Sequence, residues 1–366
     1  MELRIQKSLL AKAVGLVGNV AAQRANTLPI LGNILLETTK EGNIQMVGTD
    51  LEVGISTAVP ATILAEGSIT VPAKKLTEII RELPECEVEI SVAKNNAVSI
   101  KAEKAYFKIM GLSKEDYPKL PEWKLEDGIE MEQASLREGL ALTSFAISSD
   151  ETRYVLNGVL VSVKGKKIRF VATDGRRLAF IEKDFENAKA KSFDMIVPTK
   201  AVHELLKMLT WDGIVHVIAT KNQAVFSMGD SYLSTRLIEG NFPNYEQVIP
   251  KEEKTSSVAN REELLQAIRR TSLLTSPESP AVKMDFVKGK ILISSRSPNM
   301  GEAKEELPAE MKGNEMAIGF NPQYLIDVLR NLDVEKIGMS LTDPDKPGLV
   351  QGKDGYLYVV MPMQLT

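Results

Sequence analysis

The chain has few side chains that could act as acids, bases or metal ligands near neutral pH. Its two histidines are His203 and His216, and neither has a Cys, a second His or a carboxylate at a spacing typical of metal ligands. The phosphate-loop, dinucleotide-binding and nucleophile-elbow motifs are absent from the sequence. We therefore expect both histidines to be structural or solvated, and we expect no metal and no cofactor.

Two Thr-Asp pairs, Thr49-Asp50 and Thr173-Asp174, could supply carboxylates to a divergent hydrolase. Each pair follows an apolar strand, and the two pairs occupy matching places in successive repeats of the chain. Asp at the end of a strand commonly forms a turn by accepting hydrogen bonds from the backbone that follows it. We interpret both pairs as turns, which argues against an enzyme, and Asp50 or Asp174 remains the site of the hydrolase alternative.

The elements that would position any site form a threefold repeat. An apolar strand leads into a helix at Ile69–Leu83, at Met195–Leu209 and at Ile318–Leu332. Val71 and Val197 are 126 residues apart, and Val197 and Phe320 are 123 apart. Each unit also contains an earlier amphipathic stretch, at Ser8–Val20, Ser135–Ser148 and Asn260–Ser272, followed by hairpin-like strands. We predict three copies of one α+β domain, each with two helices packed on antiparallel sheets.

Composition is typical of small globular domains in a reducing compartment. The 366 residues are 43% hydrophobic, which is enough apolar material for three small cores. The single Cys86 rules out a disulfide framework, and no apolar run reaches the roughly 20 residues that span a bilayer. Lys12 interrupts the apolar N-terminal stretch, so its helical spacing favours a core helix over a signal peptide. We expect a cytoplasmic protein with no membrane partner.

Two polar, Pro-started stretches without apolar periodicity, residues 121–128 and 250–257, are typical of short linkers. We place the domain boundaries there, which gives domains at 1–125, 126–252 and 253–366. The six predicted helices carry eleven basic and seven acidic residues, although the whole chain has a net charge of −4. This excess of basic residues indicates a binding surface only if all six helices face the same partner.

Motifs in all three repeats closely resemble the bacterial DNA polymerase III beta subunit, or beta sliding clamp. They are Leu28–Asn33, Gly48–Glu52, Val71–Lys75, Tyr154 with Leu156-Asn157-Gly158, Ala172–Gly175, Arg177–Ala179, Gly240–Tyr245 and Val359–Met363. The resemblance covers the whole chain. It implies a head-to-tail homodimeric ring with sheets outside and helices lining the lumen, which encircles duplex DNA without sequence preference. The implied partners are the clamp loader complex, the replicative polymerase catalytic subunit, and other DNA polymerases and repair proteins that carry clamp-binding peptides.

The resemblance also implies three kinds of site. The implied DNA contacts are Arg24, Lys74, Tyr154 and Lys200, and the implied dimer interface contains Lys75, Leu273 and Leu274. The implied peptide-binding pocket lies between the second and third domains and consists of Arg153, Leu156, Thr173, Gly175, Arg176, Arg177, Leu178, Pro243, Val248, Asn321, Tyr324, Val359, Met361, Pro362 and Met363. Methionine suits such a surface because its flexible, polarizable side chain can repack against different partners.

Two departures from the family pattern concern the implied DNA contacts: Arg24 lies one residue further from the Leu28-Pro29 pair, and Asp150 stands where the family often has Gln, so the exact DNA contacts stay open. At the pocket rim Arg176, Gln247 and the ending Gln364-Leu365-Thr366 depart from the pattern, so the preference among partner peptides stays open. A repeat-built scaffold that binds peptides but not DNA is the second alternative, and it differs from a clamp because circular DNA would not retain it.

Overall fold

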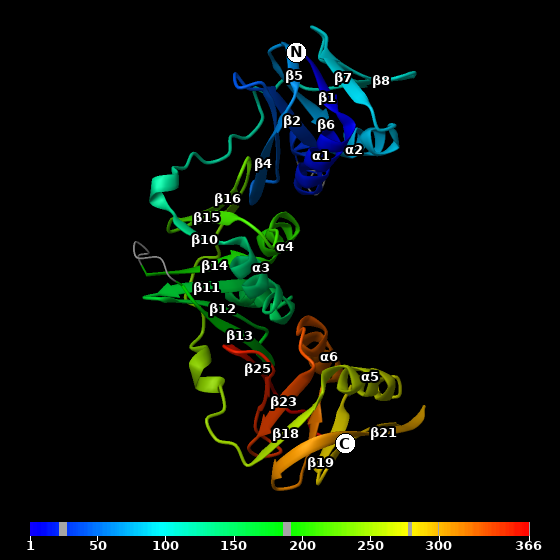
Figure 1. Cartoon of the computed structure of the whole chain (residues 1–366), viewed down its shortest axis with the longest axis vertical. Helices are drawn as coiled ribbons and strands as arrows, with labels where there is room; N and C mark the ends of the chain where they lie inside the picture. The colour runs from blue at the N-terminus through cyan, green and yellow to red at the C-terminus, as the bar shows by residue number, and fades with distance from the viewer. Residues whose placement is uncertain (22–27, 186–191, 277–279, 299, 366) are drawn as a thin grey trace. The chain divides into compact units, whose positions relative to one another are not determined.

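The computed structural model describes residues 1–21, 28–185, 192–276, 280–298 and 300–365. The chain forms two compact units, the first made of Met1–Ala134 with His203–Leu237 and the second of Ser135–Val202 with Ile238–Thr366. Each unit therefore joins one terminal repeat to part of the central repeat (Figure 1). Among the described residues, no helix has the length and apolarity that crossing a membrane requires.

The first unit contains helices α1 (Lys7–Ala21) and α2 (Ala73–Glu82), which pack against each other. A five-stranded sheet has the order β5-β1-β7-β8-β9, and an eight-stranded sheet has the order β10-β15-β16-β17-β4-β3-β2-β6. Their strands are β1 (Glu2–Gln6), β2 (Asn33–Thr38), β3 (Asn43–Thr49), β4 (Val53–Pro60), β5 (Thr62–Ala65), β6 (Ser68–Pro72), β7 (Glu87–Val92), β8 (Ala97–Ala102), β9 (Ala105–Met110), β10 (Ile129–Glu132), β15 (Ile214–Ala219), β16 (Gln223–Met228) and β17 (Ser231–Arg236). Helix α1 buries Leu10, Val14 and Val17, so the N-terminal apolar stretch forms a core helix.

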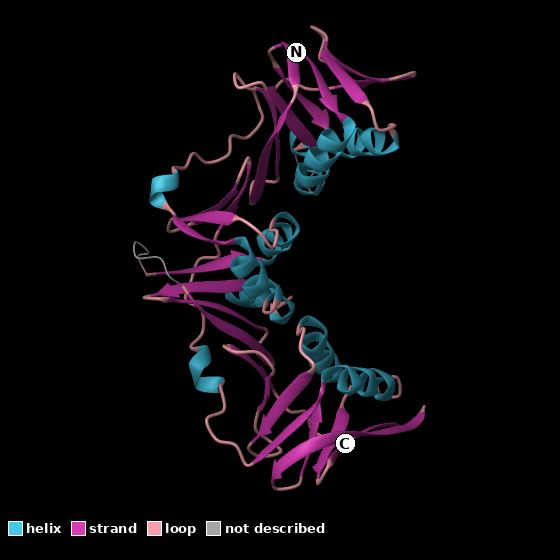
Figure 2. Ribbon diagram, in the orientation of Figure 1, coloured by secondary structure: helices cyan, strands magenta, loops and turns pink. Residues whose placement is uncertain are grey.

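The second unit is built on one twelve-stranded sheet of order β14-β11-β12-β13-β25-β24-β23-β18-β21-β20-β19-β22. Its strands are β11 (Gly158–Lys164), β12 (Lys167–Thr173), β13 (Arg177–Asp184), β14 (Phe193–Pro198), β18 (Thr255–Asn260), β19 (Val282–Val287), β20 (Lys290–Ser297), β21 (Gly301–Gly313), β22 (Met316–Phe320), β23 (Lys336–Leu341), β24 (Gly348–Gln351) and β25 (Tyr356–Val360). Helices α5 (Arg261–Ser272) and α6 (Pro322–Asn331) pack side by side (Figure 2). Helices α3 (Gln133–Ala141) and α4 (Thr199–Met208) contain the points where the chain passes between the units.

The predicted strand-to-helix step is present in all three repeats, as β6–α2, β14–α4 and β22–α6. The predicted hairpins are present as the antiparallel pairs β2–β3, β11–β12 and β19–β20. One expected helix is shorter than predicted, because α3 ends at Ala141 and a 3-10 turn follows at Ser144–Ala146. The hydroxyl of Thr143 donates to Gly139 O at 2.8 Å, a local side-chain bond that competes with continuation of the helix.

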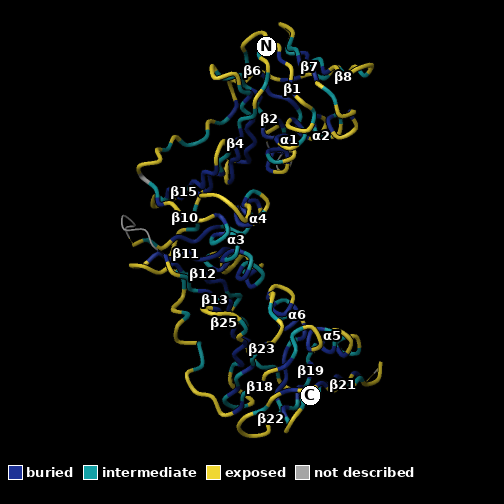
Figure 3. The backbone as a smooth tube through the Cα atoms, viewed as in Figure 1, coloured by how far each residue is buried: buried dark blue, intermediate teal, exposed yellow. Residues whose placement is uncertain are grey.

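The second predicted linker is also shorter than expected. Strand β18 begins at Thr255, inside the polar stretch 250–257, because Thr255 and Ser257 are buried and alternate with outward residues. Thr255 Oγ1 donates to Asn314 O at 2.7 Å, so burial of this hydroxyl is compensated. Figure 3 shows buried residues along the sheets, and it shows the segment that leads into β18 as mostly exposed.

Two antiparallel pairings join strands of different repeats. β4 pairs with β17, and β13 pairs with β25. Corresponding backbone hydrogen bonds flank the two pairings. Beside β4 and β17 they run from Ala58 N to Asp230 O (2.9 Å) and from Arg236 N to Glu52 O (3.0 Å). Beside β13 and β25 they run from Glu182 N to Gly355 O (2.9 Å) and from Met361 N to Arg176 O (2.9 Å). The chain therefore joins successive repeats twice in the same way.

Candidate functional site

The candidate catalytic groups form no catalytic arrangement. His203 is exposed, and His216 Nδ1 lies 3.6 Å from Glu130 Oε1 on the neighbouring strand. Among the described residues, no group of three or more His, Cys, Asp or Glu side chains is placed to hold a metal ion.

The two Thr-Asp pairs form the turns that the sequence predicts. Asp50 Oδ1 accepts from the backbone N–H of Glu52 and Val53, and Asp174 Oδ1 accepts from Arg176 and Arg177 in the same way. Both carboxylates therefore stabilise a turn between two strands. A hydrolase that used either carboxylate would have to break these backbone hydrogen bonds.

The second unit carries an apolar sheet face where the second and third repeats meet. Cross-strand pairs place apolar residues opposite one another from β14 to β24, namely Ile196–Leu160, Leu160–Val171, Val171–Phe180, Phe180–Leu357, Leu178–Val359 and Val359–Leu349. Because side chains alternate along a strand, these residues all project to one side of the sheet. We call this set the junction face.

The segment after β17 packs on the junction face and covers part of it. Ile238, Phe242, Tyr245 and Ile249 are partly buried against the cluster that contains Leu160, Val171 and Leu178. The rings of Phe180 and Tyr245 lie 5.8 Å apart between centroids. Val248 projects from the same segment with 49% of its surface exposed, and Pro243 is also exposed. An apolar surface with exposed, movable side chains at its edge is what a short apolar peptide motif needs.

Arg177 links the two repeats beside this face. Its guanidinium donates to Asp327 Oδ2 at 2.6 Å, to Asp174 Oδ2 at 3.0 Å and to Phe145 O at 2.6 Å, and it stacks on the Tyr324 ring at 4.6 Å. Burial lowers the pKa of Arg177, but the Asp327 carboxylate opposes this effect and the net pKa is raised. The guanidinium is therefore a fixed cation that holds α6 and Tyr324 against β13.

The C-terminal residues run between the two repeats. Met361 N donates to Arg176 O on the second repeat, and Met363 N donates to Gly319 O at 2.8 Å on the third. Gly319 is required for this close approach, because a Cβ there would lie 2.5 Å from Met363 O. We call residues 361–365 the C-terminal strap. Met361 keeps 41% of its surface exposed, so its side chain is accessible to solvent.

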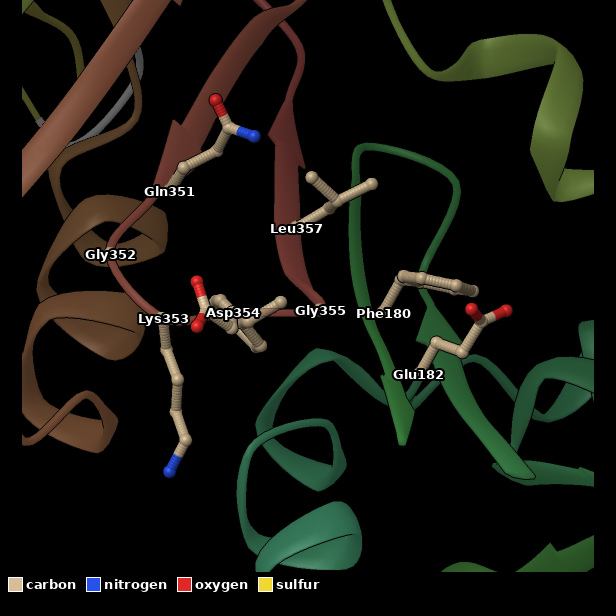
Figure 4. A pocket seen from close by; sticks show the side chains of 9 residues that line it. Phe180, Glu182, Gln351, Gly352, Lys353, Asp354, Gly355 and Leu357 are labelled. Carbon is tan, nitrogen blue, oxygen red and sulfur yellow. The ribbon is translucent and has the colours of Figure 1, made fainter. Parts of the chain in front are cut away.

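A hollow of about 600 Å³ lies at the β24–β25 turn (Figure 4). Phe180 and Leu357 of the junction face line it together with Glu182, Lys353 and Asp354. Lys353 and Lys183 both form ion pairs with Glu138 of α3, so this turn of the third repeat is tied to the second repeat. The apolar face thus continues into a recess with a charged rim.

Comparisons with known proteins give the family. Three family models match in order: the N-terminal domain of the DNA polymerase III beta subunit at residues 1–121, its central domain at 130–244 and its C-terminal domain at 246–364. The chain belongs to the DNA polymerase III beta subunit family. The beta sliding clamp of Pseudomonas aeruginosa is 35% identical over 370 residues, and that of Chlamydia muridarum is 30% identical over 365, with the whole of this chain and 99% or more of each relative covered.

Solved clamps have the same three-domain fold. A crystal structure of the Pseudomonas aeruginosa clamp bound to griselimycin has a TM-score of 0.95 at 34% identity, and the Bacillus subtilis clamp has a TM-score of 0.94 at 30% identity. Both comparisons cover all of both chains. Sliding clamps are non-catalytic processivity factors, in agreement with the expectation that the chain is not an enzyme.

The structure brings most of the predicted pocket residues of this clamp to one place. Leu178 and Val359 are opposite each other in the junction face, and Arg177 stacks on Tyr324. The remaining predicted residues are placed as follows. Thr173 ends β12, Gly175 and Arg176 lie in the β12–β13 turn, and Arg153 Nη1 lies 2.7 Å from where a Gly175 Cβ would be. Asn321 caps α6 by accepting from Gln323 N, and Leu156 is buried at the end of the 3-10 segment Glu151–Leu156. Met361, Pro362 and Met363 belong to the C-terminal strap, and Met361 N donates to Arg176 O.

Sequence reasoning missed the larger apolar members of the face, which are Leu160, Phe180, Ile196, Ile238, Phe242, Tyr245, Ile249, Leu349 and Leu357. The alternation along β11, β13 and β25 carried a signal for the strand residues. Nothing local identified which of the two sheet faces would lie at the junction.

The structure describes three of the four predicted DNA contacts. Lys74 is exposed in the first turn of α2, Lys200 is half-buried in the first turn of α4, and Tyr154 is 58% exposed next to Gly240. Arg24 lies outside the described residues. Asp150 caps the segment that carries Tyr154, and hydrogen bonds from Thr152 lower the pKa of its carboxyl.

The predicted dimer residues belong to the first and the third repeat. Leu273 is 76% exposed just after α5, and Leu274 is half-buried. Lys75 is exposed on α2, where it pairs with Glu78 at 2.7 Å. Single exposed apolar side chains are common on protein surfaces, so the dimer interface at Leu273 stays a prediction.

Proposed function

We propose that this chain is a DNA sliding clamp that works as a head-to-tail homodimer, encircles duplex DNA and tethers the replicative polymerase and other proteins through the junction face. The non-catalytic clamp family supplies the class of function. The proposals that belong to this chain are the ring, the partner sites and the three domains at 1–125, 126–252 and 253–366.

The proposal of a ring rests on which strand edges are paired within the chain and which are not. At each of the two junctions between successive repeats, a strand of the earlier repeat (β4 or β13) pairs with the last strand of the following repeat (β17 or β25). We call these the internal junctions. Two equivalent strands lack such a partner among the described residues: the first half of β21 in the third repeat and β9 in the first. A second copy, related head to tail, offers each of these edges its missing partner.

The expected dimensions agree with a clamp. Twelve helices at spacings of about 8–10 Å would give a circumference of about 110 Å and an axis-to-axis diameter of about 35 Å. Subtracting one helix diameter of about 10 Å leaves a lumen of about 25 Å, wide enough for duplex DNA. The excess of basic residues on the predicted helices would centre the phosphates by sequence-independent attraction.

The junction face supports the tethering role. It offers a preformed apolar floor, an exposed Met361 and a recess with a charged rim, features that suit short peptides with apolar anchors. We propose the clamp loader, the polymerase catalytic subunit, other DNA polymerases and repair proteins as the carriers of such peptides. We also propose that the clamp acts in the cytoplasm, where these partners and the DNA are found.

The test is loading onto DNA of two topologies. The clamp is loaded with clamp loader and ATP onto a nicked circular plasmid, and the complex is separated from free protein by gel filtration. We expect the clamp to elute with circular DNA and to be lost after a restriction enzyme linearises it. Equal retention on circular and linear DNA would show ordinary affinity, and absence from both would leave a peptide-binding scaffold as the better description.

A further inference from the structure

A hollow of about 210 Å³ lies at the first internal junction, where β4 pairs with β17. Its position corresponds to that of the predicted peptide pocket at the second internal junction, where β13 pairs with β25. Backbone hydrogen bonds fix this correspondence, because Arg236 N donates to Glu52 O at the first junction and Met361 N donates to Arg176 O at the second. The residues that line the hollow all belong to the first unit, so it is a separate site from the junction face.

The side chains at corresponding positions of the two junctions differ in chemistry. Counted from these backbone bonds, the corresponding pairs are Gly54 and Leu178, Ser234 and Val359, and Arg236 and Met361. Three apolar side chains of the predicted pocket are therefore replaced by a glycine, a hydroxyl and a guanidinium. The linker fills the space above Gly54, since a Cβ there would lie 2.3 Å from Leu120 Cδ2. The hollow therefore selects a different ligand from the junction face.

Two hydrogen-bond donors at the hollow have no partner for their side chains within the described part of the chain. They are the guanidinium of Arg236 and the amide of Gln223, which lie directly opposite each other in the pairing of β16 with β17. Side chains of opposed residues in an antiparallel pair are neighbours on one face of the sheet. Lys119 also lines the hollow and is exposed, and Glu52 supplies a carboxylate to the lining. The two cations outnumber this carboxylate, so the hollow favours an anionic group.

Leu51 presents an apolar side chain at the same hollow from a strained backbone. Its φ is +77°, in the left-handed region, where the Cβ of a leucine lies too close to the following carbonyl oxygen. The corresponding residue of the second junction is Gly175, which adopts a φ of +85° without this strain. Leu51 keeps 46% of its surface exposed, so packing within the chain compensates the strain only in part. Strained residues of this kind cluster at ligand-binding positions.

We propose that this hollow is a second peptide site, which takes an acidic residue next to an apolar one. The planar guanidinium of Arg236 matches a carboxylate in two hydrogen bonds, and the Gln223 amide supplies a further donor beside it. Leu51 and Leu120 form the apolar wall for the neighbouring side chain. We call Leu51, Leu120, Gln223 and Arg236 the acidic-peptide site.

The size of the hollow limits what the acidic-peptide site can hold. Sites for drug-sized ligands occupy about 300–1,000 Å³. A volume of 210 Å³ has room for a carboxylate and one small side chain. We therefore expect weak binding that depends on charge, with a dissociation constant on the order of 0.1–1 mM.

The test compares two fluorescein-labelled peptides by fluorescence anisotropy with the full chain. One peptide is Ser-Leu-Asp-Asp-Ala-amide and the other is Ser-Leu-Asn-Asn-Ala-amide, so only the aspartate side chains supply carboxylates to the site. We expect the aspartate peptide to bind about tenfold more tightly or better, because a carboxylate forms charge-assisted hydrogen bonds with a guanidinium and an amide does not. An excess of unlabelled clamp-loader peptide should not displace it, since that peptide belongs to the junction face.

A charge reversal assigns the binding to the acidic-peptide site. Arg236→Glu should weaken binding of the aspartate peptide about tenfold or more, and its exposed position makes a folding defect avoidable, which thermal melting checks. Lys40→Glu makes the same charge change in the exposed turn at the opposite end of β3, and it should leave the affinity unchanged.

Four results would each overturn the proposal. They are no binding of the aspartate peptide to the wild type at several millimolar, equal binding of the two peptides, unchanged affinity in Arg236→Glu, and displacement by the clamp-loader peptide. All four concern the hollow at the first internal junction alone, so the proposed ring and the tethering role of the junction face stand or fall by their own test.

Discussion

Replacing Arg177 by Ala should destabilise the second unit and weaken peptide binding together. The Arg177 side chain is 10% exposed and that of Asp327 is 21% exposed. Removing one partner of a buried ion pair costs about 3–5 kcal/mol, because the remaining charge is left without compensation. We take the lower end, about 3 kcal/mol, because Asp327 retains some access to water. For a unit of this size, that corresponds to a fall in Tm of about 6–12 °C.

The assay is differential scanning calorimetry, followed by titration with a clamp-binding peptide. Arg176→Ala is the matched control for the calorimetry alone, because Arg176 is the exposed neighbour and substitutions at such positions change stability by about 0.5 kcal/mol or less. It is not a control for the peptide titration, since Arg176 belongs to the predicted pocket. Arg177→Lys should fall between the two, since a lysine keeps the charge but cannot reach Asp327, Asp174 and Phe145 O at once. A Tm for Arg177→Ala within about 1 °C of the Arg176→Ala value would refute the role of this cluster in joining the repeats.

Three further outcomes are expected. Replacing Leu273 by Ala and Leu274 by Lys together should give a monomer in sedimentation, and a persistent dimer would contradict the interface assignment. Deleting Met361–Thr366 should abolish binding of a clamp-loader peptide in a calorimetric titration while the dimer persists, whereas undiminished affinity would overturn the pocket assignment. Burial raises the pKa of Glu138, but hydrogen bonds from Lys183 and Lys353 lower it, and the net pKa is below the ordinary value of 4.5. The Glu138 carboxylate therefore stabilises the fold above pH 4.5, and this stabilisation is lost as the pH falls through the lowered pKa. The stability difference between wild type and Glu138→Gln should therefore shrink in acid denaturant titrations, and a difference that persists unchanged at pH 3 would contradict this account.

The sequence predicted the features that depend on local patterns. Alternating apolar and polar residues predicted the hairpins. An apolar strand ending in Pro72, Pro198 or Phe320 and followed by helical spacing predicted the second helix of each repeat. The turns at Asp50 and Asp174 were predictable because an Asp and the backbone two residues later determine them together.

The features that sequence reasoning could not supply depend on contacts between distant residues. Arg177 and Asp327 are 150 residues apart, and no local signal pairs them. Phe180 and Tyr245 belong to one face only because β13 pairs with β25 and the segment after β17 folds back over the sheet. Polar composition also concealed β18, since Thr255 and Ser257 are buried while their neighbours suggest a linker.

The central claim is that the clamp is held on DNA by topology and not by affinity, and the salt dependence of its lifetime on nicked circular DNA tests this most directly. Proteins held by phosphate contacts lose affinity steeply as salt rises, because binding releases counterions. We predict that the loaded clamp leaves nicked circles slowly with a weak dependence on salt, and that cutting the circle releases it at once by sliding from the ends. A lifetime that falls steeply with salt and is the same on circular and linear DNA would contradict the account.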